Sequence, residues 1–381
     1  MIPQSPHAML PVTNHDEAAR QLFTTALRHE VTVNMFAGNR QVFERRVEPA
    51  FEKEQGRKPK NRHEVRRALE RDPYIQYSSA LRLLYQEILW DSVGDSIDRQ
   101  LPQLVDRSKK IARGKTKGSL KLDPSVTVPR YLNAVDIHMM PGNYDREWME
   151  DDVFAGAIYD RGVYLRSIGN RGTYGEDYGT SFAAHVRQAW PGLKVRRVLE
   201  MGCAAGGSAV GLAQGFPGAE VHGIDVAAPM LRYAHARAES LGVPVHFSQQ
   251  NAEATNFPDG HFDAIFGFAL LHETSSTALP KILKEVHRLL SPGGVALFRE
   301  QLAYSRVSLF QAAETDWDTY NNAEPFYGRL FDMDRSKIFV DAGFKAENVL
   351  DVPVMSVAHQ RGNPRAPKSF GGFGARKEGG R

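Results

Sequence analysis

Residues 198–210 read VLEMGCAAGGSAV, an apolar run that reaches an acid and then breaks into glycines and other small residues. The apolar run is typical of a buried strand, and the small residues indicate a tight turn into a following helix. Glycines in such a turn let a ligand approach the backbone closely, and the helix N-terminus presents free N–H groups with a partial positive charge. The stretch therefore predicts a ligand site in which a phosphate or a carboxylate lies against the backbone.

The spacing of the acid and the glycines distinguishes between possible ligands. Glu200 stands two residues before Gly202, and Ala204 and Gly206 follow at the same interval. An acid directed into the turn would repel a pyrophosphate but would receive an ammonium group. Asp225 ends the next predicted strand, which is the usual place for a carboxylate that binds ribose hydroxyls. The pattern favours a nucleoside with an amine over a dinucleotide, with a structural ion pair of Glu200 as the alternative.

Strands and helices alternate from about residue 180 onwards. Five apolar stretches predict strands: RRVLEMG (196–202), EVHGIDV (220–226), VHFSQQ (245–250), FDAIFGFALL (262–271) and GGVALFRE (293–300). Repeated strand–helix units with continuous apolar strands indicate a parallel sheet that helices cover on both faces. Near the end of the chain, residues 348–360 and 369–377 flank a Gly/Pro loop and predict a hairpin, which makes the last strand antiparallel.

These features resemble the class I S-adenosylmethionine-dependent methyltransferases over roughly residues 180–378. Five stretches match the family's motifs in order: VLEMGCAAG (198–206), GIDVAAPML (223–231), QQNAEATNFPDGHFDAIF (249–266), FGFALLHE (266–273) and LKEVHRLLSPGGVALF (283–298). The first motif of the family is E/D-x-G-x-G-x-G, and Ala204 stands at its middle glycine. The resemblance implies an α/β fold, a Rossmann-like sheet with an antiparallel last strand.

The resemblance also implies S-adenosylmethionine as the cofactor. Asp225 would bind its ribose, Met230 would lie near the adenosine, and Asn251 and Ala252 would flank the adenine. The full set of cofactor-binding residues that the motifs imply is Glu200, Gly202, Ala204, Gly206, Asp225, Val226, Met230, Asn251, Ala252 and Phe268. No metal site is predicted, because the single cysteine, Cys203, excludes a thiolate cluster.

Polar residues after the fourth and fifth predicted strands are the candidates for catalysis. His272 directly follows the fourth strand, and we expect it to act as a base or to orient the methyl acceptor. The alternative is that His272 only hydrogen-bonds its own loop, as in many relatives. Glu273 and Glu300 are secondary candidates, the latter because it closes the fifth strand.

Two aromatic-rich segments are expected to bind the acceptor. One is an insert at residues 304–333, and the other precedes the sheet. The candidate residues in the two segments are His138, Met140, Tyr144, Trp148, Trp317, Tyr320, Asn321 and Tyr327. The alternative is that these aromatics fill the seam between two domains.

The first part of the chain has a mainly helical sequence pattern instead of alternating strands and helices. This difference predicts two domains, at residues 1–175 and 176–381. Asn61 three residues before Glu64, and Asp72 before Pro73, indicate helix starts. Residues 112–129 are predicted to be a loop or linker. The N-terminal part is expected to be mainly helical and to form a lid, a substrate-binding domain or a homodimer contact.

Composition narrows the possible partners. The first 120 residues carry 21 Lys and Arg against 15 Asp and Glu, concentrated at residues 52–67 and 106–121, although the net charge of the chain is only +3. No aromatic residue interrupts the second of these stretches for base stacking, which disfavours a nucleic-acid partner. The chain has no apolar run of about 18 residues or more, so we expect no membrane association and a cytoplasmic protein.

The predicted function is methyl transfer to an O or N atom of a small-molecule acceptor in secondary metabolism. The segment Phe268-Ala269-Leu270-Leu271 stands where nucleic-acid amino-methyltransferases of this fold usually carry an Asn/Asp-Pro-Pro-Tyr sequence. Two alternatives stay open. One is an RNA or protein methyltransferase that uses the basic stretches, and the other is an enzyme that keeps the cofactor for a cyclisation or decarboxylation without methylation.

Overall fold

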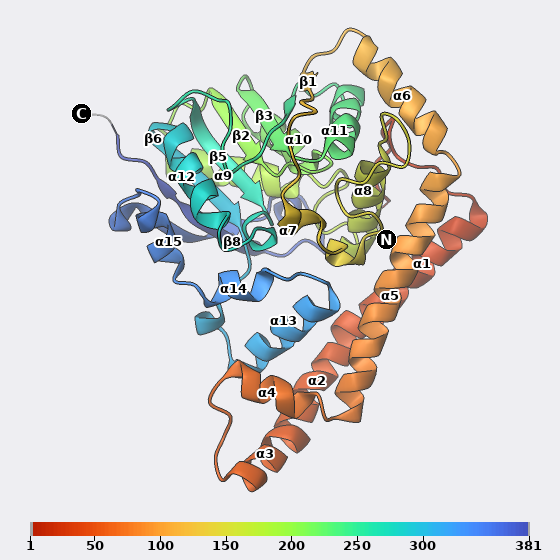
Figure 1. The fold of residues 1–381 in the computed structure, drawn as a ribbon, viewed down its shortest axis with the longest axis vertical. Helices are drawn as coiled ribbons and strands as arrows, with labels where there is room; N and C mark the ends of the chain where they lie inside the picture. Colours follow the sequence, from red (N-terminus) through yellow and green to blue (C-terminus); the bar gives the residue numbers. More distant parts are fainter. Residues whose placement is uncertain (1–2, 380–381) are drawn as a thin grey trace.

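An eight-stranded sheet is the centre of the computed structural model, which describes residues 3–379 (Figure 1). Its strands lie in the order β1-β4-β3-β2-β5-β6-β8-β7. Their bounds are β1 Ser119–Lys121, β2 Arg197–Met201, β3 Glu220–Asp225, β4 His246–Gln249, β5 Phe262–Phe268, β6 Leu290–Arg299, β7 Val349–Met355 and β8 Ser369–Arg376. All five strands predicted in the α/β part are therefore present.

The direction of the strands confirms the predicted fold class. Strands β1 to β6 pair in parallel, whereas β8 runs antiparallel to both β6 and β7. The β7–β8 hairpin is the one expected from residues 348–360 and 369–377. Parallel strands end at the same edge of the sheet, so the carboxyl ends of β2, β3 and β5 bring their following loops together.

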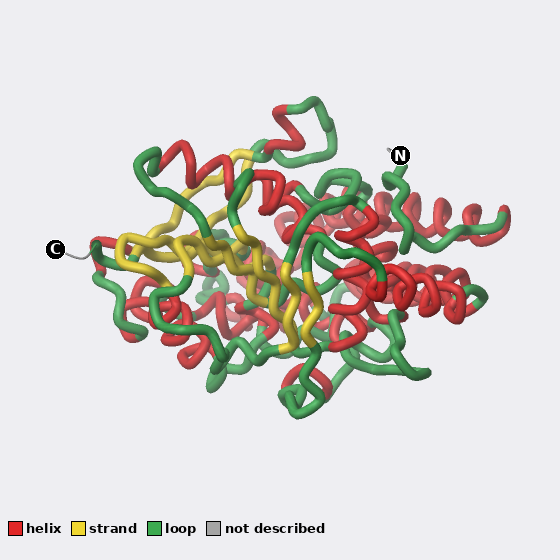
Figure 2. Tube along the Cα trace, turned by 90° about the horizontal axis from the view of Figure 1, so that it is seen from above, coloured by secondary structure: helices red, strands yellow, loops and turns green. Residues whose placement is uncertain are grey.

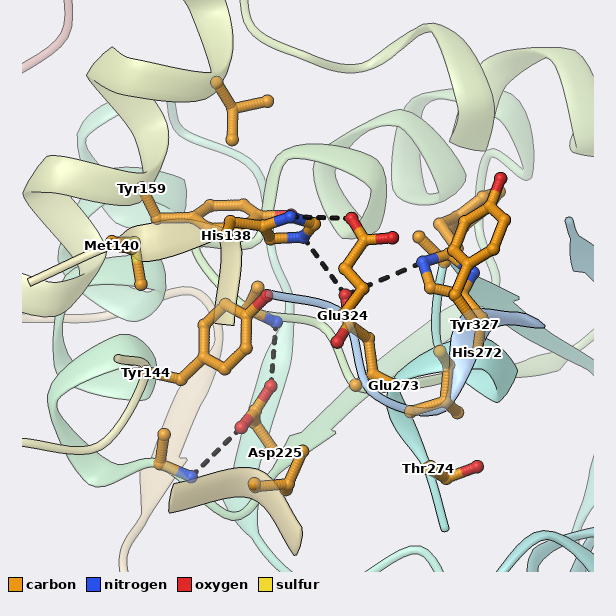
Figure 3. A pocket seen from close by; sticks show the side chains of 18 of the residues that line it. His138, Met140, Tyr144, Tyr159, Asp225, His272, Glu273, Thr274, Glu324 and Tyr327 are labelled. Carbon is orange, nitrogen blue, oxygen red and sulfur yellow. Dashed lines mark hydrogen bonds and ion pairs between the residues drawn. The ribbon is translucent and has the colours of Figure 1, made fainter. Parts of the chain in front are cut away.

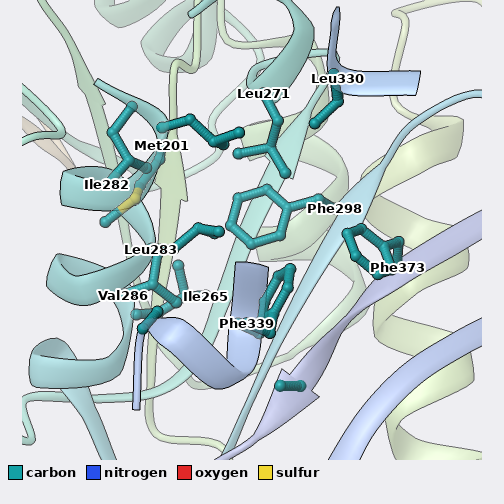
Figure 4. Close-up of a cluster of buried hydrophobic side chains, with 14 of the residues drawn as sticks. Met201, Ile265, Leu271, Ile282, Leu283, Val286, Phe298, Leu330, Phe339 and Phe373 are labelled. Atoms are coloured by element: carbon teal, nitrogen blue, oxygen red, sulfur yellow. The ribbon is translucent and has the colours of Figure 1, made fainter. Parts of the chain in front are cut away.

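Alternate residues along the strands build two separate cores. Leu199 and Ile265 face one side with α12 (Leu279–Leu289) and α15 (Arg335–Asp341). Figure 4 shows Ile265 among the side chains of this core. Val198 and Phe266 face the other side with α9 (Asp177–Ala189), α10 (Gly207–Gly215) and α11 (Ala228–Ser240). This period of two follows from the pleat of a strand that is buried on both faces.

The chain before the sheet is mainly helical and packs against one end of it (Figure 2). Its helices are α1 His15–His29, α2 Phe36–Val42, α3 Glu48–Gln55, α4 Arg62–Leu69, α5 Pro73–Asp98, α6 Leu101–Arg113, α7 Arg130–Asn133 and α8 Phe154–Ser167, with the π-helical turns η1 Glu30–Met35 and η2 Phe43–Val47 on either side of α2. The side chains of Asn61 and Asp72 accept hydrogen bonds from the backbone at the starts of α4 and α5. Both predicted helix starts are confirmed.

One short strand corrects the linker predicted at residues 112–129. Ser119–Lys121 form β1, which pairs in parallel with β4 at the edge of the sheet. Leu120 packs against the sheet core. The Gly/Lys-rich composition around it concealed a strand of only three residues, which periodicity cannot detect. The N-terminal part is therefore not purely helical, because it contributes one strand to the sheet.

The insert after β6 lies between the sheet and the N-terminal helices (Figure 1). It contains α13 (Leu309–Asn321) and α14 (Tyr327–Asp332). Asp316 pairs with Arg66 of α4 at 3.0 Å, and Asp318 pairs with Arg82 of α5 at 2.5 Å. The remaining short turns and helices are η3 Ile137–Met139, η4 Leu271–Glu273, η5 Tyr304–Arg306, η6 Ala346–Asn348 and α16 Val357–Gln360.

The outer faces of the N-terminal helices carry exposed apolar side chains. Leu22 and Phe23 of α1 are 57% and 59% exposed, and Tyr77 of α5 is 60% exposed. A homodimer contact through these helices stays a prediction. Within residues 3–379, none of the helices combines the length and the apolar character that crossing a membrane requires.

Substituting Gly179 tests the close packing of α9 on α10. A Cβ atom at Gly179 would lie 2.1 Å from the carbonyl oxygen of Ser208 in α10. We expect Gly179→Ala to lower the free energy of unfolding by about 1–3 kcal/mol, because the two backbones must move apart. Thermal denaturation measures the change. Gly192→Ala is the matched control, since no atom lies within 4 Å of its Cβ position; equal stability of the two variants would contradict the packing described.

Candidate active site

A cavity of about 430 Å³ opens at the carboxyl ends of the strands (Figure 3). The sheet, the segment before α8 and the insert all contribute to its wall. Of the residues predicted to bind cofactor or acceptor, the wall contains Gly202, Ala204, Asp225, Val226, Asn251, Ala252, Phe268, His138, Met140, Tyr144 and Tyr327. Two of the predicted catalytic residues, His272 and Glu273, also line it. The cavity thus brings together residues that are far apart in the sequence.

The turn after β2 places Asp225 in the cavity wall. Gly202 and Ala204 both adopt positive φ angles, of 68° and 43°. The backbone N–H of Ala204 donates to one oxygen of Asp225 at 3.0 Å, and the N–H of Ala227 donates to the other at 3.0 Å. Burial raises the pKa of Asp225 above its usual value, and these backbone N–H groups oppose the shift. The carboxylate is therefore held in one orientation before any ligand binds.

Glu200 lies behind this turn rather than in the cavity wall. Its side chain is 1% exposed, and the Ser208 hydroxyl donates a hydrogen bond to Oε1. Oε2 is buried and has no hydrogen-bond partner among the described residues. Burial raises the pKa of Glu200 to about 8. A buried oxygen of this kind is costly unless a donor satisfies it, and an ammonium group would do so.

Two further residues of the predicted cofactor set lie outside the cavity wall. Met230 is fully buried between α11 and the N-terminal helices. Gly206 has a φ of 74°, and a Cβ atom there would lie 3.0 Å from the Cβ of Ala234. Both positions therefore contribute to packing. A strand–turn–helix motif needs residues that face the ligand, and it also needs small or apolar residues that let the turn pack against the next helix.

His138 is fixed in an unusual backbone conformation at the centre of the site. His138 and Met139 have φ angles of 59° and 57°, in the left-handed region that non-glycine residues rarely adopt. The His138 carbonyl oxygen accepts hydrogen bonds from Gln86 Nε2 at 2.6 Å and from Trp90 Nε1 at 2.7 Å. Strain of this kind costs on the order of 1–3 kcal/mol per residue and persists where surrounding contacts enforce it.

The imidazole of His138 lies between two carboxylates (Figure 3). Nδ1 is 2.8 Å from Oε1 of Glu324, and Nε2 is 3.1 Å from Oε1 of Glu273. Burial would lower the pKa of His138, but the two carboxylates raise it. Burial would likewise raise the pKa of Glu324, but His138 lowers it to about 2. His138 therefore joins the segment before α8, the loop after β5 and the insert, and the two carboxylates favour its protonated form.

His272 forms a second histidine–carboxylate pair beside the first. Its Nδ1 is 2.5 Å from Oε2 of Glu300, and the N–H of Leu271 donates to Oε1 of the same carboxylate at 2.9 Å. Burial would lower the pKa of His272, but Glu300 raises it to about 9. Nε2 of His272 is 3.6 Å from Oε1 of Glu273. Glu300 itself lies behind His272 and outside the cavity wall, so it acts only through that histidine.

The predicted acceptor residues on α13 face away from the cavity. Trp317 and Asn321 hydrogen-bond to Ser79 of α5, and Tyr320 is 72% exposed. The residues of this part of the insert that line the cavity are Thr315, Asp318, Thr319 and Asn322. Their spacing of three and four residues defines the opposite face of the helix. Trp148 is also outside the site, since it is 56% exposed and packs on Arg146.

Sequence reasoning missed Glu324 and the arginines of the site. Arg28, Arg166, Arg171 and Arg299 all line the cavity. Arg171 hydrogen-bonds to the phenols of Tyr178 and Tyr159, and Arg299 lies 5.3 Å from the Tyr178 ring. Burial would raise the pKa of Tyr178, but Arg171 and Arg299 lower it. In the sequence, only the position of Arg171 within a glycine-rich stretch could have indicated a site. Charged residues elsewhere in a chain are usually solvated, so the other three arginines and Glu324 gave no such indication.

His138, Glu273 and Glu324 also have the composition of a cation site. One ligand atom from each lies within 4.8 Å of the others. Both nitrogens of His138, however, already face carboxylate oxygens at hydrogen-bond distance. That geometry satisfies a protonated imidazole, whereas a metal ion needs an unprotonated nitrogen.

The sequence of the sheet matches known proteins. Residues 198–294 match the methyltransferase domain family. The demethylmenaquinone methyltransferase of Thermus thermophilus is 41% identical over 102 residues, which is 26% of this chain and 44% of that protein. The fatty-acid O-methyltransferase of Mycolicibacterium smegmatis is 34% identical over 119 residues, which is 30% of this chain and 41% of that protein. The chain thus matches less than half the length of either relative.

Solved structures give a weaker likeness. The phosphoethanolamine N-methyltransferase 2 of Haemonchus contortus, in complex with S-adenosyl-L-methionine, aligns with a TM-score of 0.41 and 16% identity, covering 58% of this chain and 57% of that one. The family match rests instead on residues 198–294, which contain the turn after β2, Asp225 and the loop after β5. By this match residues 198–294 are similar to the methyltransferase domain family, and S-adenosylmethionine is the cofactor that this similarity supports.

Proposed function

We propose that the protein transfers a methyl group from S-adenosylmethionine to an oxygen or nitrogen atom of a small-molecule acceptor. The observation that carries this proposal is the composition of one cavity, in which Asp225 and the turn after β2 lie on one side and His138, His272 and Glu273 lie on the other. The cofactor supplies an activated methyl group on a sulfonium. The protein then has to align the acceptor, exclude water and take up a proton.

The residues around the turn fit the cofactor. Asp225 is held at the cavity wall where ribose hydroxyls would meet it. We assign the ammonium group to the unpartnered Oε2 of Glu200, which the turn must uncover because this oxygen is buried behind it, and the cofactor carboxylate to Arg171 in the cavity wall. The turn has no room for larger side chains, since a Cβ atom at Gly202 would lie 2.9 Å from Leu270.

Glu273 is the group we assign to proton removal from the acceptor. Its Oε1 is shared between His138 and His272, whereas its Oε2 has no hydrogen-bond partner among the described residues. A carboxylate oxygen in this state can accept a proton or a hydrogen bond from an acceptor O–H or N–H. Burial and the two neighbouring histidines fix its direction.

His138 and His272 serve as positioning residues that hold protons. The pKa of His272 is raised to about 9, so this histidine carries a proton at neutral pH, and the carboxylates beside His138 raise its pKa as well. Their ring nitrogens hold Oε1 of Glu273 and leave Oε2 to meet the acceptor. Residues 1–175 act in this scheme as a substrate-binding domain that supplies His138, Met140 and Tyr144.

A small acceptor agrees with the names of the two relatives, one a demethylmenaquinone and the other a fatty-acid methyltransferase. Part of the positive charge of the basic stretches, which an RNA or protein acceptor would require, is neutralised within the chain. Arg57 pairs with Glu64 at 2.8 Å, Arg62 pairs with Asp332 at 2.6 Å, and Lys109 pairs with Asp151 at 2.9 Å. These cations are balanced within the chain.

Two measurements test the proposal directly. Isothermal titration calorimetry should show that S-adenosylhomocysteine, the demethylated product, binds the purified protein. Incubation with methyl-labelled cofactor and candidate acceptors should then release one S-adenosylhomocysteine per labelled product. Product formed without S-adenosylhomocysteine would instead assign the protein to non-methylating chemistry, and the absence of binding would refute the proposal.

Asp225→Asn tests the ribose contact. The substitution keeps the size of the side chain but removes a charged acceptor, so S-adenosylhomocysteine should bind about 10- to 100-fold more weakly. Asp263→Asn is the matched control, because Asp263 also accepts backbone hydrogen bonds, at the opposite end of the sheet. Equal cofactor affinity in the two variants, measured by calorimetry, would exclude the contact.

Glu200 makes cofactor binding depend on pH. Its pKa is raised from 4.5 to about 8, so between these values it is protonated in the folded protein and ionised in the unfolded chain. Stability of the ligand-free protein should therefore fall as the pH rises across this window.

Binding of an ammonium group requires the ionised form, so affinity for S-adenosylhomocysteine should rise by up to about 10-fold per pH unit toward pH 8. Glu200→Gln should abolish both trends in thermal shift and calorimetry; a wild-type profile in this variant would argue against the ammonium contact.

Glu273→Gln tests the proton-removal step. The amide has the same shape but cannot take up a proton, so kcat should fall by roughly 10²- to 10⁴-fold with little change in cofactor affinity. The measurement is transfer of labelled methyl to an acceptor identified in the screen. Glu285→Gln is a control on α12 away from the cavity, where the carboxylate only holds Thr255 and Arg288. Unchanged turnover in Glu273→Gln would give Glu273 a structural role.

A further inference from the structure

Two guanidinium groups at the helical side of the cavity have no acidic partner. Arg28 lies near the end of α1 and Arg166 near the end of α8, and both line the cavity together with Ser167, Thr315 and Thr319. Among residues 3–379, no carboxylate lies at ion-pair distance from either side chain. The Nε atom of Arg28 is buried without a hydrogen-bond partner, and Nη1 of Arg166 is 3.3 Å from Nδ1 of His138.

The acids around these arginines are committed to other groups. Asp318 pairs with Arg82 at 2.5 Å, and Glu324 pairs with His138 at 2.8 Å. Burial lowers the pKa of Arg28, the nearby charges of Arg166 and Arg82 act in the same direction, and Tyr85 and Asp318 oppose them. A partly buried cation beside other cations is unfavourable unless an anion compensates it. Among residues 3–379 no carboxylate lies within ion-pair distance of either guanidinium group to supply that anion.

The position of the pair relative to the cofactor residues indicates what the anion belongs to. Arg28 and Arg166 come from the N-terminal helices, and their neighbours in the wall come from α13. The cofactor residues Asp225 and Asn251 come instead from the strand ends, and Arg171 is available there for the cofactor carboxylate. His138 connects Arg166 with Glu273, since its Nδ1 is 3.3 Å from Nη1 of Arg166 and its Nε2 is 3.1 Å from Oε1 of Glu273. An anion at Arg28 and Arg166 would therefore be part of the molecule that meets Glu273.

We propose that Arg28 and Arg166 form a subsite for an anionic group, a carboxylate or a phosphate, on the methyl acceptor. This inference rests on the proposed function, since it assigns a charge to the acceptor of that reaction. Guanidinium groups suit both anions because their planar N–H groups donate two parallel hydrogen bonds. Neutral acceptors of the same size would leave the two cations uncompensated and would bind more weakly.

Matched pairs of probes test the subsite on the full-length protein saturated with S-adenosylhomocysteine. Benzoate is compared with benzamide for a carboxylate, and phenyl phosphate with phenol for a phosphate, by calorimetry or ligand-observed NMR. At least one anion should bind about 10-fold or more tightly than its neutral partner. Equal binding within both pairs, or no binding of either anion at tens of millimolar, would overturn the proposal.

Variants locate the effect. Arg28→Gln and Arg166→Gln should each remove most of the preference for the anion, whereas Arg28→Lys and Arg166→Lys should keep part of it. Arg20→Gln is the matched control, because Arg20 lies on the same helix α1 but pairs with Asp95 at the surface. A preference that persists in the Arg28→Gln/Arg166→Gln double variant would overturn the assignment.

The cofactor serves as an internal check on this experiment. S-adenosylhomocysteine should bind the wild type, Arg28→Gln and Arg166→Gln with similar affinity. If it binds the wild type but not these variants, while Arg20→Gln is normal, the guanidinium groups hold the cofactor carboxylate and the acceptor subsite is refuted. If it fails to bind the wild type, the proposed function is refuted at an earlier step, and the two failures are thereby distinguished.

Discussion

The contact of His138 with two carboxylates determines how the cavity is closed. The imidazole of His138, from the segment before α8, meets Glu273 from the loop after β5 and Glu324 from the insert. Without the His138 side chain, Glu273 and Glu324 would face each other across the cavity as two carboxylates with no positive partner between them. A buried pair of this kind adds little net stability, because desolvation offsets much of the attraction, but breaking it by removing one partner is costly. Its effect is to specify one arrangement of the three segments.

The strained backbone of His138 follows from the same constraint. Gln86 and Trp90 of α5 hold the carbonyl oxygen of His138, while the two carboxylates hold its ring. Both ends of one residue are therefore anchored, and the chain accepts a left-handed conformation to satisfy them. Helix α5 thereby positions the chemistry of the site although only Trp90, near its middle, lines the cavity.

The half of the site that holds the cofactor could be predicted because its chemistry is local. A strand, a glycine turn and the acid that ends the next strand lie within about one strand–helix–strand unit, so their spacing carries geometric meaning. The acceptor half has no such local signal. On α13 both faces carry polar residues, and periodicity alone could not tell that Thr315, Asp318 and Thr319 face inward while Trp317 and Tyr320 do not. Glu324 and Arg28 acquire their roles only through tertiary contacts between segments far apart in the sequence.

Strand β1 has a consequence for how molecules enter and leave. Because residues 119–121 pair with β4 at the edge of the sheet, the segment from there to α9 is attached at both ends to the sheet and the helices that cover it. That span carries His138 and Tyr144. Ligand entry and product release then require local movement of this tethered span, or movement of α1 and α5 relative to α13. They do not require the whole N-terminal part to rotate away from the sheet about a single hinge.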